Sequence, residues 1–178
     1  EGSVVPIRAK AYVNGRPTAI ATQTYFTERS YTVPVVAINT RPEYLFSDSL
    51  GILAQGCCAD SVQPYYGANF WKDWEREMNI EFYEPDGTLA FNQPAGIRVF
   101  GGWSKGLPQK SLAIIARSKY GNNRFEYPLF PNRHMDEYKT FILRNSGSDF
   151  NITHFRDAFL TQLSAPLNVD IQEYRPVA

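Results

Sequence analysis

The chain has 178 residues, and its 18 Lys and Arg residues balance its 18 Asp and Glu residues. This length suits one domain with a sizeable core, and a hydrophobic content of 43% with 20% charged residues is typical of a globular protein. A balanced charge gives no support to a nucleic-acid or anionic-membrane partner. No apolar run approaches the roughly 20 residues of a membrane span. The aromatic content of 15% suits a β-rich protein and also a carbohydrate-handling surface.

Residues 1–28 predict two strands joined by a tight turn. Alternation over residues 5–11 is followed by Asn14-Gly15, a strong hairpin signal, and by a second alternating segment over residues 20–26. An isolated hairpin is only marginally stable in water, so this segment is expected to pack on the rest of the chain.

The next part of the chain is less regular. Residues 34–38 predict a short buried strand, and residues 54–70, rich in Gly, Ala, Gln and Tyr, predict an irregular loop. The only cysteines, Cys57 and Cys58, are adjacent. Their Cα atoms are about 3.8 Å apart, closer than disulfides prefer, so we interpret them as small buried residues rather than a disulfide, a redox pair or a metal site.

Five aromatic side chains follow one another around this loop. They allow two interpretations: a platform that stacks on sugars, or a cover over the core beneath the loop, which is the commoner role of such clusters. The five are Tyr65, Tyr66, Phe70, Trp71 and Trp74.

The central feature is a strand, a glycine-rich turn and a second strand over residues 95–120. Gly101, Gly102 and Gly106 permit close backbone approach, and N–H groups of such a turn can cradle phosphate. The alternative is an ordinary hairpin with a solvated basic loop, because glycine-rich turns are common. The P-loop pattern fails, since Gln109 stands where glycine must precede Lys110. The polar side chains at the turn are Arg98, Ser104, Lys105, Lys110 and Ser111.

The remaining pattern predicts further strands and one helix. Strands are expected at residues 78–83, 125–130, 138–143 and 170–174, with a turn at residues 84–87. Apolar residues recur at helical spacing over residues 152–164, and Asn151 or Thr153 could cap that helix. The sequence therefore predicts an α+β fold, mostly antiparallel sheet, with one principal helix near the C-terminus that packs Phe155, Phe159 and Leu163 on the sheet.

Five segments, taken in order, resemble the CotH (spore coat protein H) family of atypical kinases. They are LFSDSLGI at 45–52, WEREMNIEFYEPDG at 74–87, AGIRVFGGWS at 95–104, PQKSL at 108–112, and FILRNSGSD at 141–149 with FRDA at 155–158. The resemblance covers roughly residues 31–178, as the N-terminal part of a kinase domain. Residues 1–30 resemble the terminal strands of a chitobiase-type C-terminal β-domain.

The resemblance implies binding of ATP with Mg²⁺ and an unidentified protein acceptor, at a secreted or cell-surface location. By resemblance, Lys110 is the nucleotide-phosphate lysine, Arg98 and Ser104 support it, and Arg144 orients a phosphate or a structural carboxylate; Gly101 and Gly102 belong to the same turn. Lys105 is expected to matter less than Lys110.

In this family the metal-holding acidic residues come after the segments matched in this chain. The chain alone is therefore expected to bind nucleotide weakly, with little Mg²⁺ dependence, and not to transfer phosphate. The alternative is a non-catalytic β-rich surface module that binds glycan through the aromatic cluster. Unpaired sheet edges at residues 3–27 or 168–175 are expected to promote self-association.

Overall fold

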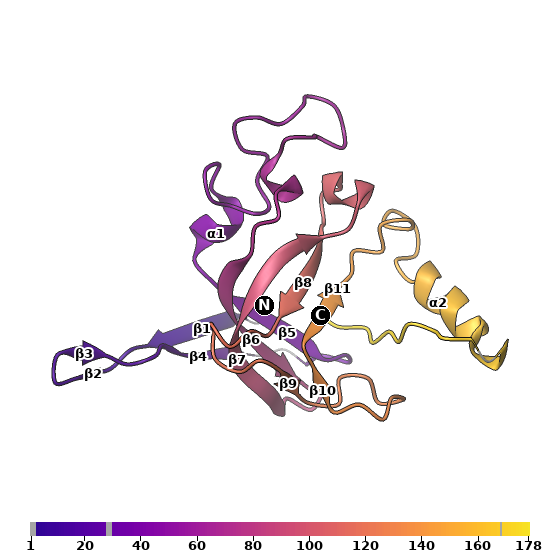
Figure 1. The fold of residues 1–178 in the computed structure, drawn as a ribbon. Helices are drawn as coiled ribbons and strands as arrows, with labels where there is room; N and C mark the ends of the chain where they lie inside the picture. Colours follow the sequence, from indigo (N-terminus) through magenta and orange to yellow (C-terminus); the bar gives the residue numbers. More distant parts are fainter. Residues whose placement is uncertain (1–2, 28–29, 168) are drawn as a thin grey trace.

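The computed structural model describes residues 3–27, 30–167 and 169–178. Its centre is a five-stranded antiparallel sheet in the order β11–β8–β7–β6–β5 (Figure 1). The strands are β5 (Val35–Asn39), β6 (Arg76–Tyr83), β7 (Leu89–Phe100), β8 (Ser111–Ile115) and β11 (Thr140–Leu143). The predicted α+β class, with mostly antiparallel strands and one main helix near the C-terminus, is confirmed.

One face of this sheet forms the hydrophobic core. Alternate residues of β6 and β7 point to it, and the register pairs Met78 with Ala95 and places Ile97 opposite Ile114 of β8. The segments before β6 and after β8 add Phe70 and Phe125 to this core, and both are buried. The period of two in the sequence thus corresponds to real burial along β6, β7 and β8.

The N-terminal hairpin has the predicted form. Strands β1 (Val4–Ala9) and β4 (Ala21–Phe26) pair antiparallel, and β2 (Tyr12–Val13) with β3 (Arg16–Pro17) continues the hairpin to its tip. Asn14 and Gly15 both have positive φ, at 51° and 74°, as a tight hairpin turn requires. Figure 1 shows this hairpin extending away from the sheet, with its tip the most remote part. The domain boundary expected after residue 30 adjoins residues 28–29, which lie outside the described residues.

The base of the hairpin is attached to the second face of the sheet through buried polar groups. The carboxylate of Glu81, fully buried on β6, accepts a hydrogen bond from the Thr24 N–H at 2.7 Å and lies 2.6 Å from the Tyr83 hydroxyl. Asn92 of β7 donates to the Thr22 carbonyl at 2.6 Å. Side chains of the sheet therefore satisfy backbone groups of β4.

Several short elements complete the connections. The helix α1 (Pro42–Phe46) was not predicted, although Pro42 stands at the helix start, where proline is favoured. The strand predicted at 125–130 is limited to β9 (Phe125–Glu126), which pairs with β10 (Glu137–Tyr138). The remaining single turns are the 3-10 helices η1 (Asn69–Trp71), η2 (Trp103–Gly106) and η3 (Ala165–Leu167).

The C-terminal helix forms, but its predicted packing is wrong. Helix α2 (Arg156–Leu163) has no buried residue, and Phe155, Phe159 and Leu163 are 58%, 52% and 59% exposed. Figure 1 shows the helix standing off to the side of the sheet. Neither Asn151 nor Thr153 caps it; the buried Asp149 carboxylate instead accepts a hydrogen bond from the Arg156 N–H at 3.3 Å. Loop contacts set its position.

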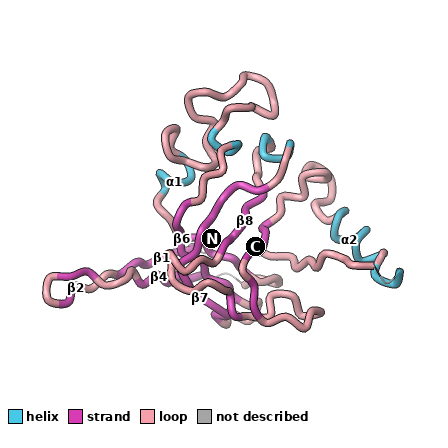
Figure 2. Tube along the Cα trace, in the orientation of Figure 1, coloured by secondary structure: helices cyan, strands magenta, loops and turns pink. Residues whose placement is uncertain are grey.

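The strand predicted at residues 170–174 is also wrong, because this segment has no regular secondary structure, as Figure 2 shows. The tail reaches the far edge of the sheet only at its end. The Val36 N–H donates to the Ala178 carbonyl and the Ala178 N–H donates to the Pro34 carbonyl, each at 2.9 Å. Arg175 forms an ion pair with Glu84 on the way. Among the described residues, no helix is long and apolar enough to cross a membrane.

The two cysteines differ from their predicted environment. Cys57 and Cys58 are both exposed free thiols, so the expectation of burial is wrong. They lie in the loop that stands above the sheet, where Ala68, Asn69 and Phe70, later in the same loop, provide its buried contacts.

Candidate phosphate site at the turn between β7 and β8

The glycine-rich turn begins where the ladder between β7 and β8 ends, at the pair Phe100 and Ser111. Gly101 has a φ of +115°, and a Cβ there would lie 2.8 Å from the Ser104 hydroxyl oxygen. The backbone angle thus favours glycine, whereas the Ser104 hydroxyl could rotate away from a Cβ. Within the described part of the chain, the N–H groups of Gly101 and Gly102 donate to no protein acceptor. They are available to an anion.

A hollow of about 430 Å³ opens beside these two glycines, which we name the turn pocket. It contains two cations and one carboxylate, so its formal charge is positive. Arg98 Nη1 lies 2.6 Å from the Asp73 carboxylate, whose side chain is 85% exposed. The Lys105 ammonium lies 5.5 Å from the centre of the Trp71 ring. The pocket is lined by Asp73, Arg98, Val99, Phe100, Gly101, Gly102 and Lys105.

A second hollow of about 290 Å³ also borders Phe100 and Gly101, and we name it the hydroxyl pocket. Its base is ordered by Asn145, which donates from its side-chain amide to the Gln109 carbonyl at 2.6 Å and from its backbone N–H to Ser111 Oγ at 3.0 Å. It is lined by Phe100, Gly101, Trp103, Ser104, Ser111, Arg144, Asn145, Gly147 and Ser148.

Lys110 lies in neither pocket. Its ammonium donates to the Leu107 carbonyl at 2.8 Å and sits 4.1 Å from the centre of the Phe70 ring. Burial lowers the pKa of Lys110 from its ordinary value. Its side chain is directed to the core face, because it follows the same alternation as Leu112 and Ile114, whereas Ser111 and Arg98 belong to the opposite face.

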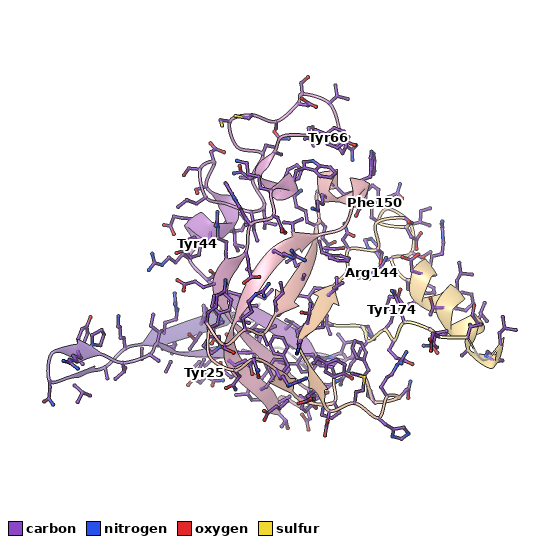
Figure 3. All side chains as sticks on the ribbon, viewed as in Figure 1. Tyr25, Tyr44, Tyr66, Arg144, Phe150 and Tyr174 are labelled. Carbon is purple, nitrogen blue, oxygen red and sulfur yellow. The ribbon has the colours of Figure 1, made fainter. Side chains whose placement is uncertain are left out.

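Arg144 is held at the rim of the hydroxyl pocket, between the sheet and helix α2 (Figure 3). Its guanidinium lies 2.5 Å from the Asp157 carboxylate and 5.8 Å from the centre of the Tyr174 ring. The carboxylate of α2 already occupies one side of this cation. The structure thus brings Gly101, Ser104 and Arg144 together in one pocket and Arg98, Gly101 and Gly102 in the other.

The aromatic cluster is divided between core and surface. Phe70 is buried, and the indole of Trp71 donates to the Pro64 carbonyl at 2.9 Å. Trp74 carries the cations of Lys72 and Arg76 at 4.3 and 4.5 Å from its ring. Only Tyr66 stands well exposed, on the loop above the sheet (Figure 3). The ring face of Trp74 is thus occupied by cations, and the Tyr66 ring lies 4.9 Å from that of Trp71.

Residues 3–27, 30–167 and 169–178 include no group of three or more His, Cys, Asp or Glu side chains that could hold a metal ion. Sequence reasoning gave Lys105 little weight and overlooked Asn145. The signal for Lys105 was present, since it lies in the same short turn as Gly101 and Gly102. Asn145 could not be found from local sequence, because its partners are 34 and 36 residues away.

The family model described as CotH kinase protein matches residues 97–178. The predicted resemblance is therefore confirmed for this segment, which begins in β7 and includes the turn, Lys110, Arg144 and helix α2. Neither a curated protein nor a solved structure matches the chain. The chitobiase-type resemblance of residues 1–30 stays a prediction.

Proposed function

Residues 97–178 match the CotH kinase family, and we propose that this chain binds the phosphates of a nucleotide at the turn between β7 and β8. The observation that carries this proposal is the turn pocket, which is lined by Arg98, Lys105 and two glycines whose N–H groups have no protein acceptor in the described part of the chain. Successive N–H groups in such a turn form an anion-binding concavity.

The electrostatics of the pocket favour a small, weakly bound anion. Arg98 and Lys105 carry two positive charges and Asp73 one negative charge, which leaves a net attraction for phosphate. All three side chains are in contact with solvent, so the attraction is screened over about 10 Å at 0.1 M salt. Affinity for ATP should therefore decrease as salt increases and should change little when Mg²⁺ is added.

Lys110 and Arg144 belong to the proposal through the family resemblance. Lys110 reaches the turn from the core face, and the low polarity around it strengthens any charge interaction that it makes. Ser104 and Arg144 line the hydroxyl pocket, which adjoins the turn pocket through Gly101. We propose that the phosphates bind in the turn pocket. Lys110, Ser104 and Arg144 lie beside this pocket and are not assigned a phosphate contact.

Calorimetric titration with ATP tests the proposal. Lys105→Ala should lower the affinity about fivefold, the equivalent of the ~1 kcal/mol that an exposed ion pair contributes at most. Lys139→Ala, an exposed lysine outside both pockets, is the matched control and should leave the affinity unchanged. Equal affinities of the two variants for ATP would show that the phosphates do not bind in the turn pocket.

A variant with the opposite sign makes the test sharper. Asp73→Asn removes the one carboxylate in the pocket and releases Arg98 from its ion pair. The affinity for ATP should then rise severalfold at low salt, and the gain should disappear at high salt. Lys110→Ala, measured beside it, decides whether the lysine on the core face contributes, as the resemblance implies.

We further propose, from the resemblance, that this chain alone does not transfer phosphate to a protein acceptor. Phosphoryl transfer needs the developing charge to be neutralised, usually by a metal bridging the phosphates. Incubation with radiolabelled ATP and Mg²⁺ should leave the chain and a general acceptor protein unlabelled. Incorporation that is lost in Lys110→Ala would show a complete kinase site. The secreted or cell-surface location also rests on the resemblance alone.

We also propose self-association through β1, which is exposed along its whole length and, among the described residues, pairs with β4 alone. Strand edges of this kind pair readily with another chain. Light scattering at increasing concentration should show dimers, and Arg8→Pro should abolish them, because the register places the Arg8 N–H on the side of β1 that faces away from β4. A monomer at every concentration would refute the proposal.

A further inference from the structure

The exposed thiols of Cys57 and Cys58 form a group that the proposed function does not use. Their Sγ atoms are 2.7 Å apart, and both side chains are exposed to solvent. Two thiols in contact on adjacent residues can react with one reagent at the same time, whereas isolated surface thiols react separately.

The loop holds this pair in a defined position. Its two branches are joined by main-chain hydrogen bonds, from Asn69 to Gln55 at 3.1 Å and from Asp60 to Tyr66 at 2.8 Å. Gly67 lies against the Cys58 carbonyl so closely that a Cβ there would be 2.3 Å from its oxygen. The backbone on both sides of the cysteines is thus fixed by the loop, which keeps the two thiols together.

We propose that Cys57 and Cys58 form a reversible vicinal dithiol, oxidised to a disulfide by a small-molecule disulfide. One thiolate attacks the reagent, forms a mixed disulfide and releases one reagent thiol. The second cysteine thiolate then attacks the mixed disulfide at the protein sulfur and releases the other reagent thiol. The protein loses two electrons and two protons, and the reagent disulfide is reduced to two thiols.

Covalent geometry makes this couple reversible. Adjacent Cα atoms are about 3.8 Å apart, below the 4.4–6.8 Å usual for disulfides, so the bond is formed outside its preferred range and is more easily reduced. Exposure has the same consequence, because exposed disulfides are the labile ones in proteins. The pair is therefore suited to respond to thiol–disulfide balance rather than to cross-link the fold.

Oxidised glutathione is the probe, with intact-mass analysis and thiol titration as readouts. The native chain should lose both thiols and the mass of two hydrogens, carry no glutathione and stay monomeric in non-reducing electrophoresis. Cys57→Ser and Cys58→Ser should each retain one glutathione, because no neighbouring thiol displaces it. Since both side chains are exposed, neither variant is expected to unfold, which circular dichroism checks.

A second probe tests proximity without oxidation. Phenylarsine oxide binds tightly only where two thiols are close enough to coordinate the same arsenic atom. The native chain should therefore bind one equivalent, which an added dithiol compound removes and an added monothiol compound does not. Both single-cysteine variants should lose this binding. A native chain that carries two glutathiones, forms linked dimers, or binds the arsenical no better than the variants would overturn the proposal. The result is independent of nucleotide binding.

Discussion

The N-terminal hairpin and the C-terminal helix are both attached to the five-stranded sheet, but by different interactions. The hairpin buries Thr22 and Thr24 and places its backbone groups on the side chains of Glu81 and Asn92. Helix α2 buries none of its residues and is positioned by loop contacts to Asp149 and by the ion pair between Arg144 and Asp157. The hairpin thus combines satisfied backbone groups with the packing of Phe26 against Tyr83, at 5.1 Å between ring centres, whereas the apolar side chains of α2 stay exposed.

Among the contacts that attach peripheral segments to the sheet, the largest effect is expected at Glu81, which joins the hairpin to the sheet. Glu81→Ala leaves the buried Thr24 N–H without its acceptor, which costs about 1–3 kcal/mol. It also removes one of the two acceptors of the Tyr83 hydroxyl, which keeps the Thr24 carbonyl at 2.9 Å. The free energy of unfolding, measured in denaturant, should fall by roughly 3 kcal/mol. Glu77→Ala, an exposed residue of the same strand, is the control and should change it by less than about 0.5 kcal/mol. Equal effects would show that the hairpin is attached by other contacts.

Glu75, which precedes β6, holds the segment after β8 through Arg117, Lys119 and Tyr120. We expect its contribution to stability to be smaller than that of Glu81, larger than that of the helix contacts, and dependent on pH. Burial raises the pKa of Glu75, but hydrogen bonds from Arg117, Lys119 and Tyr120 outweigh it and bring the pKa to about 2. The folded pKa is below the ordinary value of 4.5, so the carboxylate stabilises the fold above that pH. This contribution is lost as pH falls from about 4.5 toward about 2.

Thermal unfolding between these pH values should therefore show a steeper loss of stability in the native chain than in Glu75→Gln. The variant should be less stable by roughly 1–3 kcal/mol at neutral pH, the usual contribution of hydrogen bonds to a charged group. Parallel pH profiles for the two proteins would mean that the ion cluster of Glu75 does not form in solution.

Removal of the Asp149 carboxylate, which lies at the start of helix α2, should destabilise only the segment around the helix. The Thr153 hydroxyl, which hydrogen-bonds to Asp149, lowers the pKa of that carboxyl, and the Arg156 N–H also donates to it. Asp149→Ala should cost the local segment about 1 kcal/mol, as loss of a helix cap does. Hydrogen exchange should accelerate over residues 150–163 while the global unfolding midpoint stays unchanged. A large shift of that midpoint would show that α2 is part of the cooperative core.

The smallest effect is expected for the apolar side chains of the helix itself. Phe159→Ser removes a ring that is 52% exposed, so the unfolding free energy should change by less than about 0.5 kcal/mol. Phe125→Ala, at 0% exposure, should cost about 3–5 kcal/mol in the same assay. If Phe159→Ser lowered the free energy of unfolding by more than about 1 kcal/mol, α2 would have to pack on the sheet in solution, as the sequence predicted.

The elements that were predicted correctly are those in which the residue pattern along the chain also determines which side chains are buried. The alternation of Met78, Ile80 and Phe82 and the Asn14-Gly15 turn correspond to real features, because register and turn angles are local properties. The candidate site stays a prediction; the structure shows that Arg98, Gly101 and Gly102 line one pocket with Lys105, which received little weight. The exposure of α2 and of Cys57 could not be predicted, since spacing indicates a helix or a loop but not what lies beside it.

Chemical-shift mapping of backbone amides during titration with tripolyphosphate tests the central claim most directly. This probe carries the phosphates of ATP without its base or sugar, so any response reports on the phosphate site alone. We predict the largest saturating shifts at the amides of Gly101, Gly102 and Lys105, reduced in Lys105→Ala and unchanged in Lys139→Ala. Shifts centred on Arg144 and helix α2, or no saturable shift at the turn, would contradict the account.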